Sequence, residues 1–283
     1  NTDKYVQAYF QYDSKKSGGL TISHLRFGDA PIHSTYYVNN ASFIACHNPS
    51  YMSKYDIVSD VNPGGSFLLN CPWSDDELDE KLPASAKRYI AENDIQFYTC
   101  DASKIAVEVG LGATRTNTVL QAAFFKITEI IPIDKAVDAM KEAIRKTYGR
   151  KGQKIVDMNC AAVDRGLTGA HKVDVPESWK NAEDRAEATA PKADDPFLAQ
   201  YLTDILEPSI AQKGDDIPVS KFLPTRDGIL PSGTSAYEKR GVAVSVPVWI
   251  KENCVECNIC SLVCPHGAIR PFAVTREEAE ASG

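Results

Sequence analysis

The sequence predicts an α/β fold with a mostly parallel sheet and flanking helices, followed by two smaller segments. Three observations lead to this prediction: apolar runs alternate with helical patterns over the first 170 residues, the composition changes over residues 171–194, and four cysteines crowd together after residue 250. Strands that alternate with helices favour a parallel sheet covered on both faces. With 283 residues, two or three domains are expected.

Five segments have the pattern of β-strands. Tyr5–Tyr12 alternates between apolar and polar residues, and Leu20–Phe27 alternates again before Gly28. Three short apolar runs bounded by turn residues have the length of buried strands: Ser42–Cys46, Phe67–Leu69 and Ile95–Tyr98.

Four helices follow from their start and stop signals. Ser74 and Glu77 have the spacing of a capping box, and Pro83 can open a second helix that turns Tyr89 and Ile90 inward. Thr116 or Asn117 can cap a helix over Thr118–Ile127. Asp134 can cap a further helix that Gly149 ends. The apolar residues on one face of this last helix are Ala136, Val137, Met140 and Ile144.

The remaining residues form three segments. Residues 171–194 are rich in Ala, Asp, Glu, Lys and Pro and are interpreted as a linker or surface excursion. Residues 195–247 contain an amphipathic helix near Phe197–Leu206 and are too few to support a large core alone. Val242–Ile250 is strand-like and leads into the cysteines.

Composition excludes two classes of function. A net charge of −7 argues against non-specific nucleic-acid binding, which needs a basic face. No apolar run approaches the roughly 20 residues that span a bilayer, and no signal peptide opens the sequence, so a cytoplasmic protein without a membrane partner is expected. Because Asn1 rather than Met opens a strand-like segment, we expect the sequence to be part of a longer polypeptide.

The cysteine run has a spacing that dictates a chemistry. Cys254, Cys257, Cys260 and Cys264, followed by Pro265, read C-x2-C-x2-C-x3-C-P, which is how bacterial-type ferredoxins bind [4Fe–4S] clusters. In two-cluster ferredoxins the fourth cysteine serves the other cluster. A zinc knuckle or chance clustering are the alternatives, but zinc sites usually pair two units across a longer gap. Residues 248–283 are therefore interpreted as the N-terminal half of a ferredoxin-like domain, whose second run the sequence lacks.

The other cysteines and most histidines are interpreted as structural. Widely spaced free cysteines among apolar neighbours behave as small buried hydrophobes in a reducing compartment. The cysteines are Cys46, Cys71, Cys100 and Cys160. The histidines interpreted as structural are His24, His33, His47 and His171, which are scattered along the sequence. His266 follows the run and is a candidate to tune a cluster by hydrogen bonding.

Two loops are candidate anion sites. Lys15, Lys16 and Ser17 precede two glycines between the first two strands, where cations and free backbone N–H groups can receive phosphate. Arg115 and Asn117 stand at the start of a helix, whose N-terminus favours negative charge. A plain solvated turn and a helix cap without a ligand remain the alternatives.

Four ordered motifs resemble one family. Lys4–Gly28, Gly110–Lys126, the triplet Glu238-Lys239-Arg240 and the cysteine run are similar to the pyruvate:ferredoxin (or flavodoxin) oxidoreductases. The resemblance implies a gamma-type domain over residues 1–170, a small α+β domain named for its EKR triplet over 195–247, and the start of a two-cluster ferredoxin domain over 248–283.

The resemblance also implies an activity and its partners. Such enzymes decarboxylate pyruvate oxidatively with coenzyme A to acetyl-CoA and CO₂, and pass electrons through [4Fe–4S] clusters to ferredoxin or flavodoxin. Thiamine diphosphate and Mg²⁺ would bind outside this chain, to the remaining domains of a homodimeric enzyme, so the chain alone is expected to be inactive. Lys15, Lys16, Ser17, Arg115 and Asn117 are the expected coenzyme A contacts. The alternative is a stand-alone electron-transfer or docking module without an active site of its own.

Overall fold

The computed structural model describes residues 4–12, 19–184, 193–238 and 247–281. The chain divides into two compact units, residues 1–242 and 243–283. In the first unit, four strands form one sheet in the order β3 (Ala41–Cys46), β4 (Val61–Asn70), β5 (Gln96–Cys100) and β6 (His171–Lys172). The first three are parallel and β6 is antiparallel to β5, so the expected mostly parallel sheet is confirmed.

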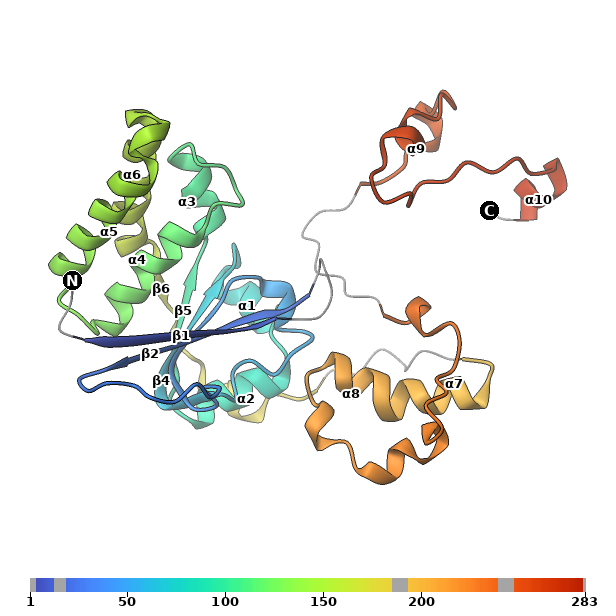
Figure 1. Ribbon diagram of the computed structural model, residues 1–283, viewed down its shortest axis with the longest axis horizontal. Coiled ribbons are helices and arrows are strands. Elements are labelled where there is room, and N and C mark those ends of the chain that lie inside the picture. Colours follow the sequence, from blue (N-terminus) through green and yellow to red (C-terminus); the bar gives the residue numbers. More distant parts are fainter. Residues whose placement is uncertain (1–3, 13–18, 185–192, 239–246, 282–283) are drawn as a thin grey trace. The chain divides into compact units, whose positions relative to one another are not determined.

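Side-chain alternation gives this sheet two apolar faces. Phe67 and Phe97 are register partners on one face, and their rings stack with centroids 5.6 Å apart. The next residues along the strands, Leu68 and Tyr98, belong to the opposite core. Both faces are covered by helices, as the alternation of strands and helices predicts (Figure 1).

The helices divide unequally between these faces. The helices α1 (Asp75–Lys81) and α2 (Ala84–Glu92) pack on the face that carries Phe67. The opposite face holds α3 (Ala102–Glu108), α4 (Asn117–Thr128) and α6 (Gln153–Gly169), and α5 (Ile133–Tyr148) packs outside α4 and α6.

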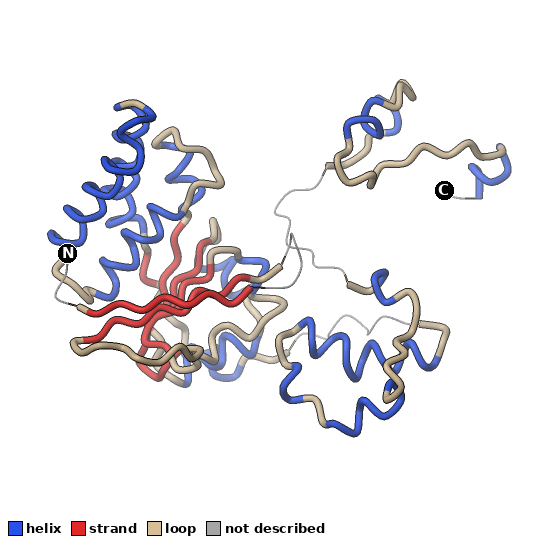
Figure 2. The backbone as a smooth tube through the Cα atoms, viewed as in Figure 1, coloured by secondary structure: helices blue, strands red, loops and turns tan. Residues whose placement is uncertain are grey.

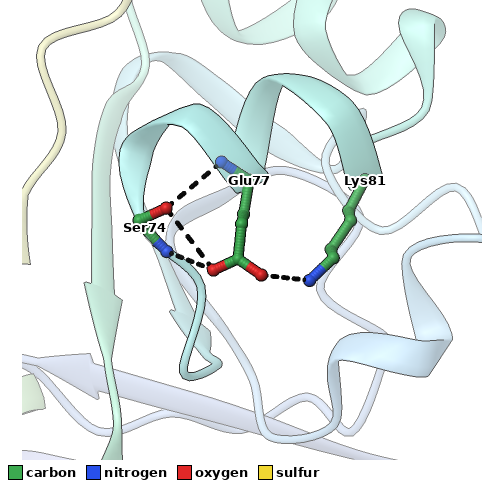
Figure 3. A network of polar contacts seen from close by, with 3 residues as sticks. All are labelled: Ser74, Glu77 and Lys81. Carbon is green, nitrogen blue, oxygen red and sulfur yellow. Dashed lines mark hydrogen bonds and ion pairs between the residues drawn. The ribbon is translucent and has the colours of Figure 1, made fainter.

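The capping box at the start of α1 is confirmed. The Ser74 hydroxyl accepts the backbone N–H of Glu77 at 3.3 Å, and the Glu77 carboxylate accepts the N–H of Ser74 at 3.0 Å (Figure 3). Lys81 binds the other oxygen of Glu77 at 2.5 Å. Lys81 and the Ser74 N–H lower the pKa of Glu77, which keeps its carboxylate ionised for this role.

Other helices differ from expectation, and α3, like α6, has no predicted counterpart. Thr116 is the N-cap of α4, but its side chain makes no cap hydrogen bond. The prediction that Asp134 caps the next helix is wrong, because α5 begins at Ile133 after Pro132 and Asp134 lies within its first turn. No predicted helix matches α6, whose inward face is built largely from small residues that weaken the hydrophobic signal: Val156, Ala162, Val163 and Gly166.

The core of the sheet extends past residue 170. Trp179, in the 3-10 turn Glu177–Asn181, is only 2% exposed and lies 6.2 Å from the Phe97 ring. Its Nε1–H donates to Asp79 at 2.7 Å. Around Trp179, the chain is therefore part of the core rather than the expected surface excursion over 171–194.

β1 (Tyr5–Tyr12) and β2 (Thr21–Gly28) form a separate two-stranded antiparallel ribbon, drawn in red with the other strands in Figure 2. Register partners run from Tyr5 with Gly28 to Tyr12 with Thr21. The ring of Phe27 in β2 stacks on Phe124 of α4 at 6.1 Å, which fastens one end of the ribbon.

The described residues after 192 form short helices. The predicted helix near Phe197–Leu206 is present as α7 (Pro196–Tyr201), a π-helical turn Leu202–Leu206 and α8 (Glu207–Ile210). In the second unit, α9 (Ile259–Val263) and α10 (Arg276–Ala281) are helical. Residues 247–250 are not a strand, contrary to expectation, and 242–246 lie outside the described residues. No helix in the described part is both long and apolar enough to cross a bilayer.

Candidate functional site

The first candidate anion loop joins β1 to β2. Its flanking strands are confirmed, with Tyr12 paired to Thr21 at the end of the ribbon. Lys15, Lys16 and Ser17 themselves lie outside the described residues. Their assignment to a phosphate site therefore stays a prediction.

The second candidate loop precedes α4. Gly110 and Gly112 adopt φ values of +87° and +89°, which favour glycine, and Arg115 closes a turn by donating its N–H to the Gly112 carbonyl at 3.1 Å. The side chains of Arg115 and Asn117 are both exposed. Within the described part of the chain, the Arg115 guanidinium has no hydrogen-bond or ion-pair partner.

The start of α4 leaves backbone donors for a ligand. Because Thr116 makes no side-chain cap, the first N–H groups of this 12-residue helix are not satisfied by it. Asn117 is the first helical residue, and Arg115 lies two residues before it. The structure thus brings together an exposed guanidinium, an amide side chain and a helix N-terminus, which is a combination suited to an anion.

The cysteine run lies in an irregular loop and a short helix. Cys254, Cys257 and Cys260 are exposed, and Cys264 follows α9 and is half-buried. The backbone turns through left-handed conformations at Glu256 (φ 54°) and Asn258 (φ 58°) between the cysteines. No three His, Cys, Asp or Glu side chains of the described residues gather as ligands of a single metal ion.

The chain after Pro265 folds back over Cys264. The N–H of Ala268 donates to Cys264 Sγ at 3.3 Å. Backbone N–H groups of Ile269, His266 and Ala268 lower the pKa of Cys264 and so favour its thiolate. His266 acts here through its backbone. Thiols, with amide donors beside one of them, are the type of ligand that fits iron–sulfur clusters.

Three other cysteines gather in a place that sequence reasoning did not foresee. Cys46 and Cys100 end β3 and β5, and Cys71 directly follows β4, so all three lie at the carboxyl edge of the sheet. Burial raises their pKa values to about 12 for Cys46, 11 for Cys71 and 12 for Cys100. They are protonated thiols, as expected for structural residues. Cys160 is only partly buried, less than expected.

Asn70 ties the same strand ends together. Its side chain is 8% exposed, donates to the His47 carbonyl at 2.9 Å and accepts the Ala102 N–H at 3.0 Å. One amide thus joins the segment after β3 to the end of β4 and the start of α3. The only sequence signal was its position at the end of an apolar strand.

Three family models match successive parts of the chain. Residues 1–169 match the family described as pyruvate ferredoxin/flavodoxin oxidoreductase. Residues 183–243 match a domain of unknown function named EKR, and residues 247–270 match a 4Fe-4S binding domain.

Curated relatives align along almost the whole chain. A pyruvate-flavodoxin oxidoreductase of Enterobacter agglomerans is 54% identical over 98% of this chain and 23% of its own length. A pyruvate:ferredoxin oxidoreductase of Moorella thermoacetica is 53% identical over 96% of this chain and 22% of its own. A pyruvate dehydrogenase [NADP(+)] of Cryptosporidium parvum is 44% identical over 98% of this chain and 15% of its own length. The chain therefore spans less than a quarter of the length of each of these relatives.

Proposed function

The chain belongs to the pyruvate ferredoxin/flavodoxin oxidoreductase family, and from this premise we propose that it is one part of a larger enzyme that oxidises pyruvate. The observation that carries the proposal is 54% identity, over 98% of this chain, to a protein named as a pyruvate-flavodoxin oxidoreductase. In the larger enzyme that we propose, pyruvate and coenzyme A give acetyl-CoA, CO₂, a proton and two electrons. Thiamine diphosphate and Mg²⁺ bind to the part of the enzyme outside residues 1–283.

The first unit contributes to the binding of coenzyme A. The phosphates of coenzyme A are received by Lys15, Lys16 and Ser17 and by the loop that carries Arg115 and Asn117. The exposed Arg115 guanidinium, which has no partner among the described residues, and the start of α4 without a side-chain cap support this assignment. These residues bind and orient the thiol substrate and take no part in breaking its bonds.

The second unit holds an electron carrier. A [4Fe–4S] cluster, when bound, accepts and passes on one electron at a time. Cys254, Cys257 and Cys260 supply three thiolates to one cluster, and Cys264 supplies one to a second cluster. The match of residues 247–270 to a 4Fe-4S binding domain supports this assignment.

The final electron acceptor is selected outside this chain. Relatives named for flavodoxin, ferredoxin and NADP(+) all share this segment at 44–54% identity. We assign the full-length enzyme to the cytoplasm as a homodimer, on the resemblance of its motifs.

Kinetics of the full-length enzyme test the coenzyme A site. Arg115→Ala, and separately Lys15→Ala with Lys16→Ala, should raise KM for coenzyme A about tenfold or more, because each lost charge-assisted hydrogen bond is worth about 1.5–3 kcal/mol. KM for pyruvate should change little. Arg150→Ala removes another exposed arginine, in the turn Gly149–Lys151, and is the matched control. Equal KM values for coenzyme A in all variants would remove these residues from the site.

Electron paramagnetic resonance tests the cluster assignment. In the full-length enzyme, Cys257→Ser and Cys264→Ser should perturb two different reduced-cluster signals, while Cys160→Ser leaves both unchanged. If Cys257→Ser and Cys264→Ser perturb the same signal, all four cysteines serve one cluster and the two-cluster assignment is wrong.

A further inference from the structure

The two faces of the β1–β2 ribbon have different surroundings. Residues that are register partners in an antiparallel pair lie on the same face. Gln7 with Arg26 and Tyr9 with His24 therefore share one face, and Val6 with Phe27 and Ala8 with Leu25 share the other. The ribbon is shown in Figure 2.

The first face is partly covered by residues 36–38 of the same chain. The Arg26 guanidinium donates to the carbonyls of Tyr36 and Tyr37 and lies 3.9 Å from the centre of the Tyr36 ring. The Val38 N–H donates to His24 Nδ1 at 3.0 Å. The His24 and Tyr37 rings stack at 4.9 Å. These contacts cover the part of the face around His24 and Arg26, while Tyr9 remains 40% exposed and Tyr5 49% exposed.

The second face is apolar and open over most of its length. Val6 is 52% exposed, Phe10 48%, Tyr12 71% and Leu25 44%. The rings of Phe10 and Tyr12 stack side by side at 6.1 Å. At one end of this face, Phe27 stacks on Phe124 of the same chain. We call the residues Val6, Ala8, Phe10, Tyr12 and Leu25 the open ribbon face.

The composition of this face indicates the chemistry of its partner. All five residues are apolar or aromatic, and Ser23 and Thr21, which share the face, are uncharged. A contiguous exposed apolar patch marks an interaction surface. The partner is therefore an apolar protein surface rather than a charged ligand or a nucleic acid.

The length of the relatives identifies the occupant. The relatives that are 54% and 53% identical contain this whole segment, yet it makes up only 23% and 22% of them. We propose that the open ribbon face packs against an apolar surface of the full-length polypeptide that lies outside residues 1–283. The ribbon is thus a docking arm between this domain and the rest of the protein, a role separate from the binding of coenzyme A or clusters.

Photo-crosslinking in the full-length protein tests this proposal. The photoreactive amino acid p-benzoylphenylalanine would replace Phe10 or, in a second variant, Tyr12, and mass spectrometry would identify the linked peptides. We expect both positions to link to residues outside 1–283. Tyr36, 62% exposed on the segment that covers the other face, and Val107, 56% exposed on α3, are control positions and should not link to that same surface.

Two results would overturn the proposal. Links from Phe10 and Tyr12 to residues 1–283 of a second copy would make the ribbon a contact between identical segments. An absence of links would mean that the face stays in solvent.

A stability comparison provides an independent readout. A carboxylate placed in a packed apolar contact is costly, whereas the same change in solvent is tolerated. In the full-length protein, Phe10→Asp should lower the midpoint of thermal unfolding by several degrees, and Val107→Asp should leave it unchanged. Equal midpoints for the two variants would contradict a packed ribbon face.

Discussion

The cysteines of this chain differ in chemistry at the scale of single residues. Cys46, Cys71 and Cys100 are buried thiols with raised pKa values, while Cys254, Cys257 and Cys260 are exposed. Alkylation requires both access and thiolate. In cluster-free protein at neutral pH, iodoacetamide should therefore modify the C-terminal run rapidly and leave the three buried thiols unmodified.

Peptide mass spectrometry measures this directly. In concentrated guanidinium chloride all eight cysteines should react, which controls for peptide recovery. Rapid labelling of Cys46, Cys71 or Cys100 in the native protein would show that the carboxyl edge of the sheet opens readily.

His24 makes the stability of the ribbon sensitive to pH. Burial first and the charge of Arg26 second lower its pKa, while Asp60 opposes them. The folded chain holds the ring neutral, with Nδ1 accepting the Val38 N–H. Because the folded pKa lies below the unfolded value of about 6.5, the stabilisation is present above that pH and is lost as pH falls through the folded pKa.

Thermal unfolding at a series of pH values tests this expectation. The unfolding midpoint should fall between about pH 7.5 and pH 5.5, and part of that fall should disappear in His24→Phe, which keeps a ring against Tyr37 but cannot titrate. Comparison with the wild type is essential because burial also lowers the pKa of His47. Identical pH profiles for the two proteins would show that His24 does not contribute.

At the scale of elements, the contact between α4 and α6 depends on one glycine. A Cβ atom on Gly166 would lie 2.5 Å from the Val119 carbonyl oxygen and 2.9 Å from Ala122 Cβ. Backbone atoms cannot move aside cheaply, so the two helices would have to separate. Gly166→Ala should lower the free energy of unfolding by about 1–3 kcal/mol, measured in urea.

Gly149→Ala is the matched control for this prediction. Gly149 has a helical φ of −53°, and a Cβ there would meet nothing within 4 Å. Alanine should therefore be neutral or stabilise the protein by about 0.4–1 kcal/mol. If both variants unfold at the same urea concentration, α4 and α6 do not pack as closely as the structure shows.

At the scale of the whole molecule, the sheet domain includes a segment that composition assigned to a linker. Trp179 packs on Phe97, and the Val173 N–H donates to the Phe97 carbonyl at 2.9 Å. Trp179→Ala should lower the free energy of unfolding of the sheet domain by about 3–5 kcal/mol. Trp249→Ala, at a site 70% exposed, should change it by no more than about 0.5 kcal/mol. Urea unfolding followed by circular dichroism distinguishes the two variants. If both lower the free energy of unfolding equally little, residues 171–184 are a linker and not part of the core.

The sequence alone determined those features whose causes lie within a few residues of one another. The cysteine run specifies its chemistry because four cysteines fall within one short stretch of sequence, from Cys254 to Cys264. The three parallel strands of the sheet follow from their apolar runs, and the start of α1 follows from a hydrogen-bonding exchange between Ser74 and Glu77. Each of these signals is local, so no knowledge of the fold was needed.

Tertiary structure alone decided the features that depend on distant partners. Trp179 is a core residue because it packs on Phe97 and donates a hydrogen bond to Asp79. Cys46, Cys71 and Cys100 lie at the same edge because three parallel strands end there. Residues 36–38 pack on the ribbon face that carries His24 and leave the open ribbon face exposed. The alternation of residues within β1 and β2 does not reveal this choice. Periodicity along a strand shows that two faces differ, but only the packing of separate segments decides which face is buried, because burial is a property of the neighbours.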